Sequence, residues 1–448
     1  MPPNLLVILT DQHRNGALGA DGDAFVRTPH LDALAARGVR FARSYCASPL
    51  CSPSRAAWVT GRTPLASGVT TNHQKLDPGL PTLGGVFRAA GYETVWAGKW
   101  HVPEEYPLER DAIPGFDNLP LRGRETDRNG YPVRVAGRPG AWEHNLGGYA
   151  DVPVAEAAAA FLRRPHDRPF LLVVSLMNPH DICFPTAYDR AGPVADAELA
   201  PLPPNVEPPD GEADLHRETR FTHEWSATLA KGWDDLAWQA SAALYHRFVG
   251  QADAAVGVVL DGLRAAGLEA VTPVVYTSDH GEGTPAHRWI GKLSLYEDAI
   301  SVPFIVTRPG VTGGRVERQR PASGLDLFPT LCGLAGVMPP PGLHGTDLAP
   351  VIADPSASGP ESAFCALYPV SGDSDIAGRA VRTTRWAYSA FSRGAVRETL
   401  FDLAADPGET RNLAGEPGTR PELDRHRGLL RDWLVKTGDP FPPPPVRD

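Results

Sequence analysis

The chain has 448 residues, of which 42% are hydrophobic and 21% are charged, and its formal net charge is −10. This length suits a large core divided over two or more structural units. No apolar run is long enough to span a membrane, and the acidic balance argues against non-specific nucleic-acid binding.

The first apolar run, Asn4–Leu9, is interpreted as a strand rather than as a secretion signal. It lacks a basic preceding region and a small-residue cleavage site, and Asp11 cuts it short. The five cysteines are odd in number, scattered, and contain no CxxC pair, which fits a reducing compartment. We therefore expect a cytoplasmic protein.

Apolar strands and helical patterns alternate along the chain. The predicted strands are Asn4–Leu9, Thr94–Ala97, Phe170–Leu176, Val274–Tyr276 and Val302–Val306, and the predicted helices are Pro29–Arg37, Thr82–Ala90, Val154–Arg163 and Leu236–Ala266. This pattern is typical of a mostly parallel sheet covered by helices on both faces, an α/β sandwich. Two stretches with little regular pattern, Val102–Ala150 and Ile182–Trp233, are expected to be loops that shape a substrate pocket.

A Pro/Gly-rich passage, Met338–Pro360, separates this sandwich from the end of the chain. Beyond it, Arg379–Tyr388 and Glu398–Leu403 look like antiparallel strands, and Pro421–Lys436 looks like a helix. We therefore predict a catalytic domain of residues 1–355 and a smaller C-terminal α+β unit of residues 356–448.

Residues 51–62 read CSPSRAAWVTGR and predict a short helix. Ser52 is a suitable N-cap, Pro53 suits the first helical position, and Gly61 suits the position after the end. Cys51 then lies at the positive end of the helix, with Arg55 one turn along, where an anion can bind. For a single cysteine, a buried structural thiol is the commoner explanation, so the other motifs must decide.

Polar residues follow four of the apolar strands. They are Asp11 and Gln12 after the first strand, Lys99 and His101 after the second, Asn178, His180 and Asp181 after the third, and Asp279, His280 and Glu282 after the fourth. In open α/β sheets, ligands bind outside the carboxyl ends of the strands. One such residue carries no meaning because every strand must end, but four strands ending in residues that a core does not need indicate a site.

The residue types indicate the chemistry of this site. Asp11, Gln12, Asp279 and His280 offer oxygen and imidazole ligands for a divalent cation, whereas Arg55, Lys99, Lys292, His101 and His180 offer positive charge and proton transfer. This combination fits attack on a sulfate or phosphate ester. Taken singly, Asp11 can cap a turn, Lys292 can be a solvated charge, and His180 can be a satisfied loop histidine.

CSPSRAAWVTG, with Pro49-Leu50 ahead of it, is similar to the sulfatase signature, in which the cysteine is oxidised to Cα-formylglycine. Further matches run in order along nearly the whole chain: PNLLVILTDQ, GYETVWAGKWH, NPHD, SDHGE and GKLSLYEDAISVPFIV. The C-terminal RAVRTTRWAY and ETLFDLAADPGETRNL resemble the small C-terminal sheet of the family. The resemblance implies an alkaline-phosphatase-like α/β/α sandwich with that sheet as a separate unit.

The resemblance also implies a role for each matching residue. Formylglycine at position 51 would be the nucleophile, made from Cys51 by a formylglycine-generating enzyme that reads the motif before folding. Asp11, Gln12, residue 51, Asp279 and His280 would surround one divalent metal. Arg55 would orient the formylglycine, Lys99, Lys292 and His180 would hold the sulfate, and Asn72 would contact a sulfate oxygen. His180 or Lys292 would protonate the leaving oxygen, and His101 would act as base in the release of sulfate.

Two positions depart from the commonest pattern of the family. Many sulfatases have Asp where Gln12 stands and Asn where His280 stands. The Gln/His combination resembles choline-sulfatase-like enzymes and phosphonate monoester hydrolases. It replaces an anionic ligand by an imidazole, so Mn²⁺ becomes the alternative to Ca²⁺, which is the metal expected first.

The leading hypothesis is therefore a sulfuric ester hydrolase acting on aryl, alkyl or carbohydrate sulfates. The alternative is a phosphonate monoester or phosphodiester hydrolase with the same formylglycine, and Lys99 with His101 favours the sulfatase. A non-catalytic anion-binding relative is the third hypothesis, disfavoured because every catalytic position holds a competent side chain. Arginines between Leu121 and Gly140 can meet a saccharide or simply form a solvated basic face. An oligomer is compatible with the sequence.

Overall fold

The computed structural model describes residues 2–72, 74–102, 113–119, 147–184, 192–309, 313–369 and 375–443. The predicted pocket loop Val102–Ala150 and its arginines lie largely outside these residues. Among the described residues, no helix is both long and apolar enough to cross a membrane.

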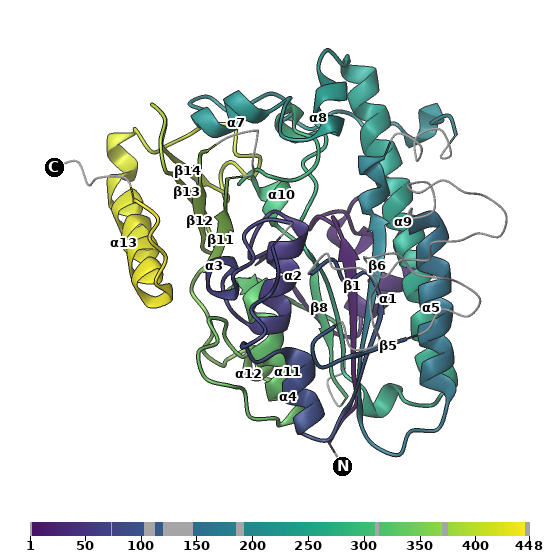
Figure 1. Cartoon of the computed structure of the whole chain (residues 1–448). Coiled ribbons are helices and arrows are strands. Elements are labelled where there is room, and N and C mark those ends of the chain that lie inside the picture. The colour runs from purple at the N-terminus through teal and green to yellow at the C-terminus, as the bar shows by residue number, and fades with distance from the viewer. Residues whose placement is uncertain are drawn as a thin grey trace.

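The main sheet has eight strands in the order β5-β4-β6-β1-β7-β8-β2-β9 (Figure 1). Their bounds are β5 Asp117–Asn118, β4 Glu93–Gly98, β6 Phe170–Pro179, β1 Leu5–Asp11, β7 Val274–Ser278, β8 Phe304–Thr307, β2 Val39–Phe41 and β9 Arg315–Glu317. All neighbours run parallel except β8, which is antiparallel to both β7 and β2. The expected mostly parallel sheet is confirmed.

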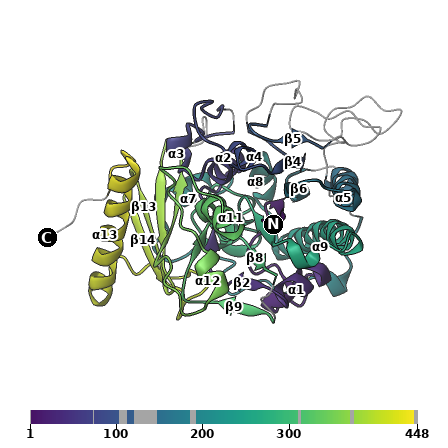
Figure 2. The same cartoon turned by 90° about the horizontal axis from the view of Figure 1, so that it is seen from below.

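Helices cover both faces of this sheet. In β1, Leu5, Val7 and Leu9 face one core, while Leu6 and Ile8 face the other, which explains the unbroken apolar run. The first core is closed by α2 Cys51–Thr60, α4 Leu83–Ala89, α11 Leu327–Ala335 and α12 Ala349–Ala353. The second is closed by α1 Pro29–Ala35, α5 Gly147–Arg163 and α9 Asp235–Ala265, which lie together on one side in Figure 2. The α/β/α sandwich is thus as predicted.

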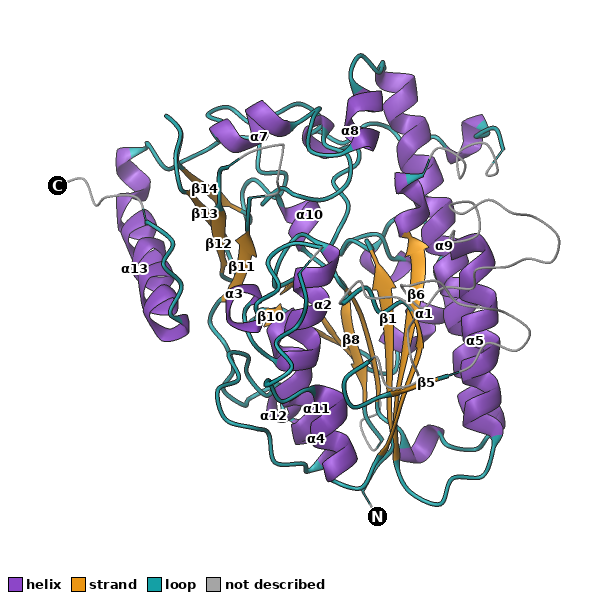
Figure 3. Cartoon of the chain, in the orientation of Figure 1, coloured by secondary structure: helices purple, strands orange, loops and turns teal. Residues whose placement is uncertain are grey.

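A four-stranded antiparallel sheet forms the C-terminal part (Figure 3). Its strands are β11 Ala363–Leu367, β12 Gly378–Arg382, β13 Trp386–Phe391 and β14 Glu398–Asp402, and α13 Arg420–Thr437 packs on it. The buried guanidinium of Arg382 reaches out of this sheet and donates to Leu295 O at 2.6 Å. The small sheet therefore supports the segment that follows Lys292. The predicted boundary at residue 355 stays a prediction.

The remaining elements are short. Among them are the strand pair β3 Ser44–Tyr45 and β10 Ala322–Ser323, the helices α3 Pro64–Ser67, α7 Asp214–Thr219, α8 Trp225–Ala230 and α10 Glu297–Ile300, and the 3₁₀ turn η2 His180–Cys183. Because α7 and α8 lie within 182–233, that stretch is less irregular than predicted. The predicted strand Arg379–Tyr388 is also wrong as a single element. It folds back as β12 and β13, where Thr383 Oγ1 accepts from Trp386 N at 3.1 Å in the turn.

Candidate active site

The polar residues at the strand ends converge at one edge of the main sheet. Asp11 ends β1, Lys99 follows β4, His180 opens η2 directly after β6, and Asp279 follows β7. Since β4, β6, β1 and β7 are consecutive in the sheet, their carboxyl ends form one continuous edge. The motifs that are spread along the chain therefore meet at a single site.

Helix α2 delivers Cys51 to this edge, and its start differs from the prediction. The helix begins at Cys51 with Leu50 as N-cap, two residues before the predicted start at Pro53 with Ser52 as N-cap. Ser52 is engaged elsewhere, because its N–H donates to Asn72 Oδ1 at 3.0 Å and its hydroxyl donates to His101 O at 2.5 Å. These contacts pin the first turn to two other segments. Gly61 ends the helix with a φ of 62°, as expected of a left-handed C-terminal residue.

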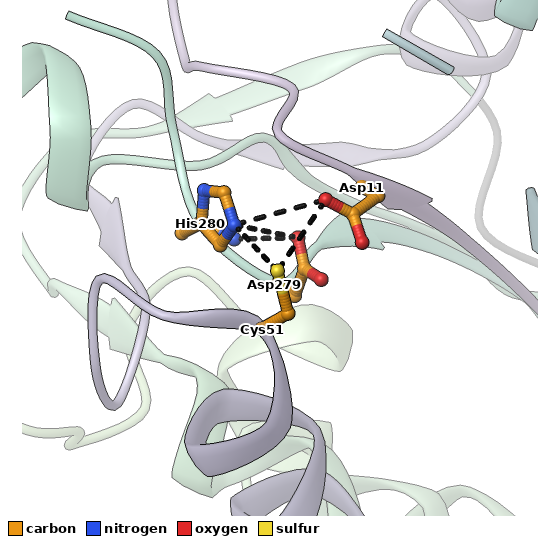
Figure 4. Close-up of side chains that lie close together, drawn as sticks. All are labelled: Asp11, Cys51, Asp279 and His280. Carbon is orange, nitrogen blue, oxygen red and sulfur yellow. Dashed lines mark hydrogen bonds and ion pairs between the residues drawn. The ribbon is translucent and has the colours of Figure 1, made fainter. Parts of the chain in front are cut away.

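Asp11, Cys51, Asp279 and His280 form a compact buried cluster (Figure 4). One ligand atom from each lies within 4.8 Å of all the others. Cys51 Sγ is 3.3 Å from His280 Nε2 and 3.8 Å from Asp11 Oδ1, and His280 Nε2 is 3.8 Å from Asp279 Oδ1. Two carboxylates and an imidazole at this spacing suit a divalent cation.

The electrostatics of the cluster also suit a cation. Burial alone would lower the pKa of His280, but Asp279 and Cys51 raise it to about 9. Its Nδ1 is 2.9 Å from Gly281 O, which leaves Nε2 directed into the cluster. Burial would raise the pKa of Asp11, yet Lys99, His180 and Arg55 hold it well below its ordinary value. Asp11 therefore stays an anion.

Arg55 is a buried cation that contacts both carboxylates of this cluster. Its side chain is fully buried, and it donates to Asp279 Oδ2 at 2.8 Å and to Asp11 Oδ2 at 3.0 Å. It also donates to Ser175 Oγ at 2.9 Å and to Lys99 O at 3.2 Å. These contacts hold both carboxylates in place, a function that the position of Arg55 one turn after Cys51 makes possible.

Two lysines and a histidine also lie at the site. Lys99, almost fully buried, forms an ion pair with Asp11. Lys292 Nζ lies 3.4 Å from His180 Nε2 and 3.3 Å from Glu224 Oε1. Burial opposes the charge of Lys292, but Cys183, Cys51 and Glu224 raise its pKa well above the ordinary value. Burial lowers the pKa of His180 well below its ordinary value, so Lys292 is the protonated member of this pair.

Gln12, His101 and Asn72 also lie near the cluster. Gln12 has a φ of 73°, its N–H donates to Asp279 Oδ1 at 3.0 Å, and its side-chain oxygen accepts from Lys292 at 3.4 Å. His101 is partly buried two residues after Lys99, and burial together with Lys99 lowers its pKa well below the ordinary value. The amide oxygen of Asn72 is used to cap α2, so its contact with sulfate stays a prediction.

Three residues of the site were missed from sequence, and a fourth, Glu282, was expected at a strand end but given no role. Ser175 accepts from Arg55, Cys183 lies 3.2 Å from the Gln12 amide nitrogen, Glu224 pairs with Lys292, and Glu282 accepts from Gln12. Glu282 is one of the polar residues that follow the fourth strand in SDHGE, but the sequence does not indicate its contact with Gln12. Glu224 stands directly before α8, in the stretch 182–233 where the sequence pattern predicted no helix.

Two family models match the chain. The model described as sulfatase covers residues 3–337, and the model described as N-sulphoglucosamine sulphohydrolase, C-terminal, covers residues 285–429. Together they account for the site and for most of the C-terminal sheet and helix.

Curated relatives match over almost the full length. The chain is 31% identical to an ulvan-active sulfatase of Formosa agariphila, over 98% of this chain and 82% of that protein. It is also 31% identical to a Δ4,5-hexuronate-2-O-sulfatase of Bacteroides thetaiotaomicron, over 98% of this chain and 90% of that protein.

Solved structures share the fold. A 2-O GAG sulfatase superposes with a TM-score of 0.85 at 29% identity, over 98% of this chain and 93% of that one. A phosphonate monoester hydrolase of Agrobacterium radiobacter superposes with a TM-score of 0.75 at 24% identity, over 97% and 96% of the two chains, which is a likeness of fold alone. Family model, full-length relatives and site agree, and the chain belongs to the sulfatase family.

Proposed function

We propose that this chain removes sulfate from a saccharide sulfate ester. The observation that carries the proposal is the position of Cys51 at the start of α2, in contact distance of His280 and Asp11 and one turn before the buried Arg55. The saccharide is supported by the two relatives, one named for ulvan and one for a hexuronate 2-O-sulfate, each matched over 98% of this chain. Among aryl, alkyl and carbohydrate sulfates, we therefore place carbohydrate sulfates first.

The proposal includes conversion of Cys51 to Cα-formylglycine by a formylglycine-generating enzyme. Once hydrated, this group offers two hydroxyls on one carbon, one to attack sulfur and one whose deprotonation expels the sulfate. The buried, polar surroundings of residue 51 fit such a group better than they fit a structural thiol. A core cysteine packs against apolar side chains, whereas Cys51 faces Asp11 and His280.

The chain's own side chains would perform the remaining steps. Arg55 holds Asp11 and Asp279 in place, and Lys99 and Lys292 supply fixed positive charge for the sulfate oxygens. Lys292 is the better candidate for protonating the leaving oxygen, because it is charged while burial keeps His180 neutral. His101, kept neutral by burial, is the candidate base for release of sulfate.

A divalent metal would bind at Asp11, Gln12, residue 51, Asp279 and His280, where it would neutralise charge on the nucleophile. We propose Ca²⁺, with Mn²⁺ as the alternative because Gln12 removes one anionic ligand and His280 adds an imidazole. We also propose a cytoplasmic location, and we consider an oligomer compatible with this chain; both rest on the sequence alone.

Phosphonate monoester or phosphodiester hydrolysis is the second candidate. It is favoured by the pair Gln12 and His280, which resembles that of the phosphonate hydrolases. It is disfavoured by Lys99 and His101, because Lys99 adds a buried cation at Asp11.

The test combines a mass measurement with three substrates. We expect the peptide that contains residue 51 to show the mass of an aldehyde in place of the thiol. The same preparation should release sulfate from a 2-O-sulfated unsaturated uronate disaccharide faster than from an aryl sulfate, and should act more slowly on phenyl phosphonate. Faster turnover of phenyl phosphonate would favour the second candidate. Full modification with no turnover of any of the three would contradict both.

A further inference from the structure

The side-chain amide of Gln12 lies between two groups of opposite hydrogen-bonding character. On one side its Nε2 donates to the carboxylate of Glu282. On the other side its Oε1 accepts from Lys292 Nζ at 3.4 Å. A carboxylate can only accept and an ammonium can only donate, so this arrangement allows one orientation of the amide.

The carboxylate of Glu282 is fully buried and receives three N–H groups. Its Oε1 accepts from Thr284 N at 2.9 Å and from Gly291 N at 2.6 Å, and its Oε2 accepts from Gln12. Gly291 directly precedes Lys292. Glu282 thus contacts both Gln12 and the backbone that carries Lys292, although it touches neither Cys51 nor Asp11 in the described contacts.

We propose that Glu282 is a positioning residue that orients the side-chain amide of Gln12. It holds the amide so that the Gln12 oxygen points away from Glu282 and toward the catalytic groups. This inference rests on the proposed function, in which Gln12 is a metal ligand. Only the oxygen of a neutral amide has a lone pair free for a metal, because the lone pair of the nitrogen is delocalised into the carbonyl. The orientation of Gln12 therefore decides whether it can serve as a ligand at all.

The variant Glu282→Gln exposes this role. A glutamine at 282 keeps one oxygen, which accepts from the backbone N–H groups of Thr284 and Gly291 as Oε1 of Glu282 does in the parent. Its NH₂ group then faces Gln12 in place of an oxygen. Gln12 must flip to accept from it, which presents the NH₂ group of Gln12 to Lys292 and to the metal. Volume and backbone contacts are retained, so the variant changes orientation rather than packing.

The exchange of the two residues should restore the arrangement. In the double variant Gln12→Glu with Glu282→Gln, the carboxylate at 12 accepts from the amide at 282 with one oxygen and keeps the other on the side of Lys292. The single variant Gln12→Glu instead places two carboxylates in direct contact. The effect of Glu282→Gln on metal binding should therefore change sign between the two backgrounds.

The test measures the dissociation constants of Ca²⁺ and Mn²⁺ by calorimetry for the parent, both single variants and the double variant. We expect Glu282→Gln to weaken binding about 10- to 100-fold, the usual effect of losing a residue that orients a ligand. The double variant should bind at least tenfold more tightly than Gln12→Glu. Glu317→Gln is the matched control, since Glu317 is a buried carboxylate that accepts from Gln319 N at 2.8 Å far from the cluster.

Each outcome decides the proposal. If Glu282→Gln binds both metals like the parent, or if the double variant binds more weakly than Gln12→Glu, the positioning role is wrong. Should the single variant Glu282→Gln fail to fold, comparing Gln12→Glu with the double variant still shows whether the exchange at 282 strengthens or weakens metal binding. A parent that binds metal but hydrolyses no sulfate ester would contradict the proposed function and not this inference. A parent that binds neither cation would overturn both.

Discussion

Replacing Lys99 by methionine is expected to remove sulfatase turnover while the fold persists. The Lys99 side chain is 2% exposed and its ammonium forms an ion pair with Asp11, so its charge acts in a site that excludes water. Methionine keeps most of the aliphatic stem and removes only the charge. Loss of one preorganised electrostatic contact costs about 2.7–4 kcal/mol of transition-state stabilisation, or about 10²–10³ in kcat.

The cost to stability should be smaller than for most buried ion pairs. Breaking such a pair typically costs about 3–5 kcal/mol because a charge is left alone. Here Asp11 retains the guanidinium of Arg55 at 3.0 Å, so the lower end of that range is expected.

The assay measures kcat on a sulfate ester and on phenyl phosphonate, with each rate divided by the fraction of chains that carry the aldehyde. The loss on the phosphonate should be at least tenfold smaller, because Lys99 is proposed to favour sulfate. Arg88→Met is the matched control, since Arg88 is 43% exposed and pairs with the half-exposed Asp117. A Lys99→Met enzyme within threefold of the parent would refute the assigned role, and equal losses on both substrates would refute the discrimination.

Three further predictions address the metal, the nucleophile and the pH dependence. Asp279→Ala should fold but lose nearly all turnover, and a chelator should abolish parent activity until Ca²⁺ or Mn²⁺ is restored; full activity after metal removal would contradict the metal site. Cys51→Ser should complete at most one turnover and accumulate a sulfate adduct, visible in the peptide mass, because a serine has no second hydroxyl to expel the sulfate; repeated turnover would count against the elimination. Burial lowers the pKa of His287 to about 4, so the unfolded chain binds this proton below pH 6.5 while the folded chain does not. The free energy of unfolding should thus fall from pH 6.5 to pH 4, and His287→Phe should reduce that fall by up to about 3 kcal/mol in urea titrations; an unchanged slope would show that His287 does not contribute.

The main sheet and the place of the site could be predicted because local pattern and topology act together there. In β1 the apolar run is continuous since alternate residues enter two different cores, and such runs predict parallel strands covered on both faces. Once the strands are parallel, residues such as Asp11 and Asp279 must meet at one edge. The positions of the strand ends in the sequence were therefore sufficient to predict that these residues lie close together.

Other features depend on contacts between distant segments, which carry no local pattern. Ser52 is a residue type that favours the N-cap, but it contacts Asn72 and His101 instead, and the helix begins two residues earlier than predicted. Glu224 pairs with Lys292 across 68 positions of the chain, within a stretch that has no periodicity. At the break between β12 and β13, the hydroxyl of Thr383 contacts Trp386 in the turn and the distant His426 in α13.

The complete burial of helix α2 has a consequence for every measured rate. All ten of its residues, Cys51 among them, are inaccessible once the chain has folded. Any enzyme that oxidises Cys51 must therefore compete in time with folding, and chains that fold first are trapped with the thiol. If Cys51 is converted as proposed, incomplete conversion gives a purified sample of two species that share the fold and differ only at residue 51. Its specific activity reports the ratio of two rates during synthesis, and slower translation or slower folding should raise it without any change in the sequence.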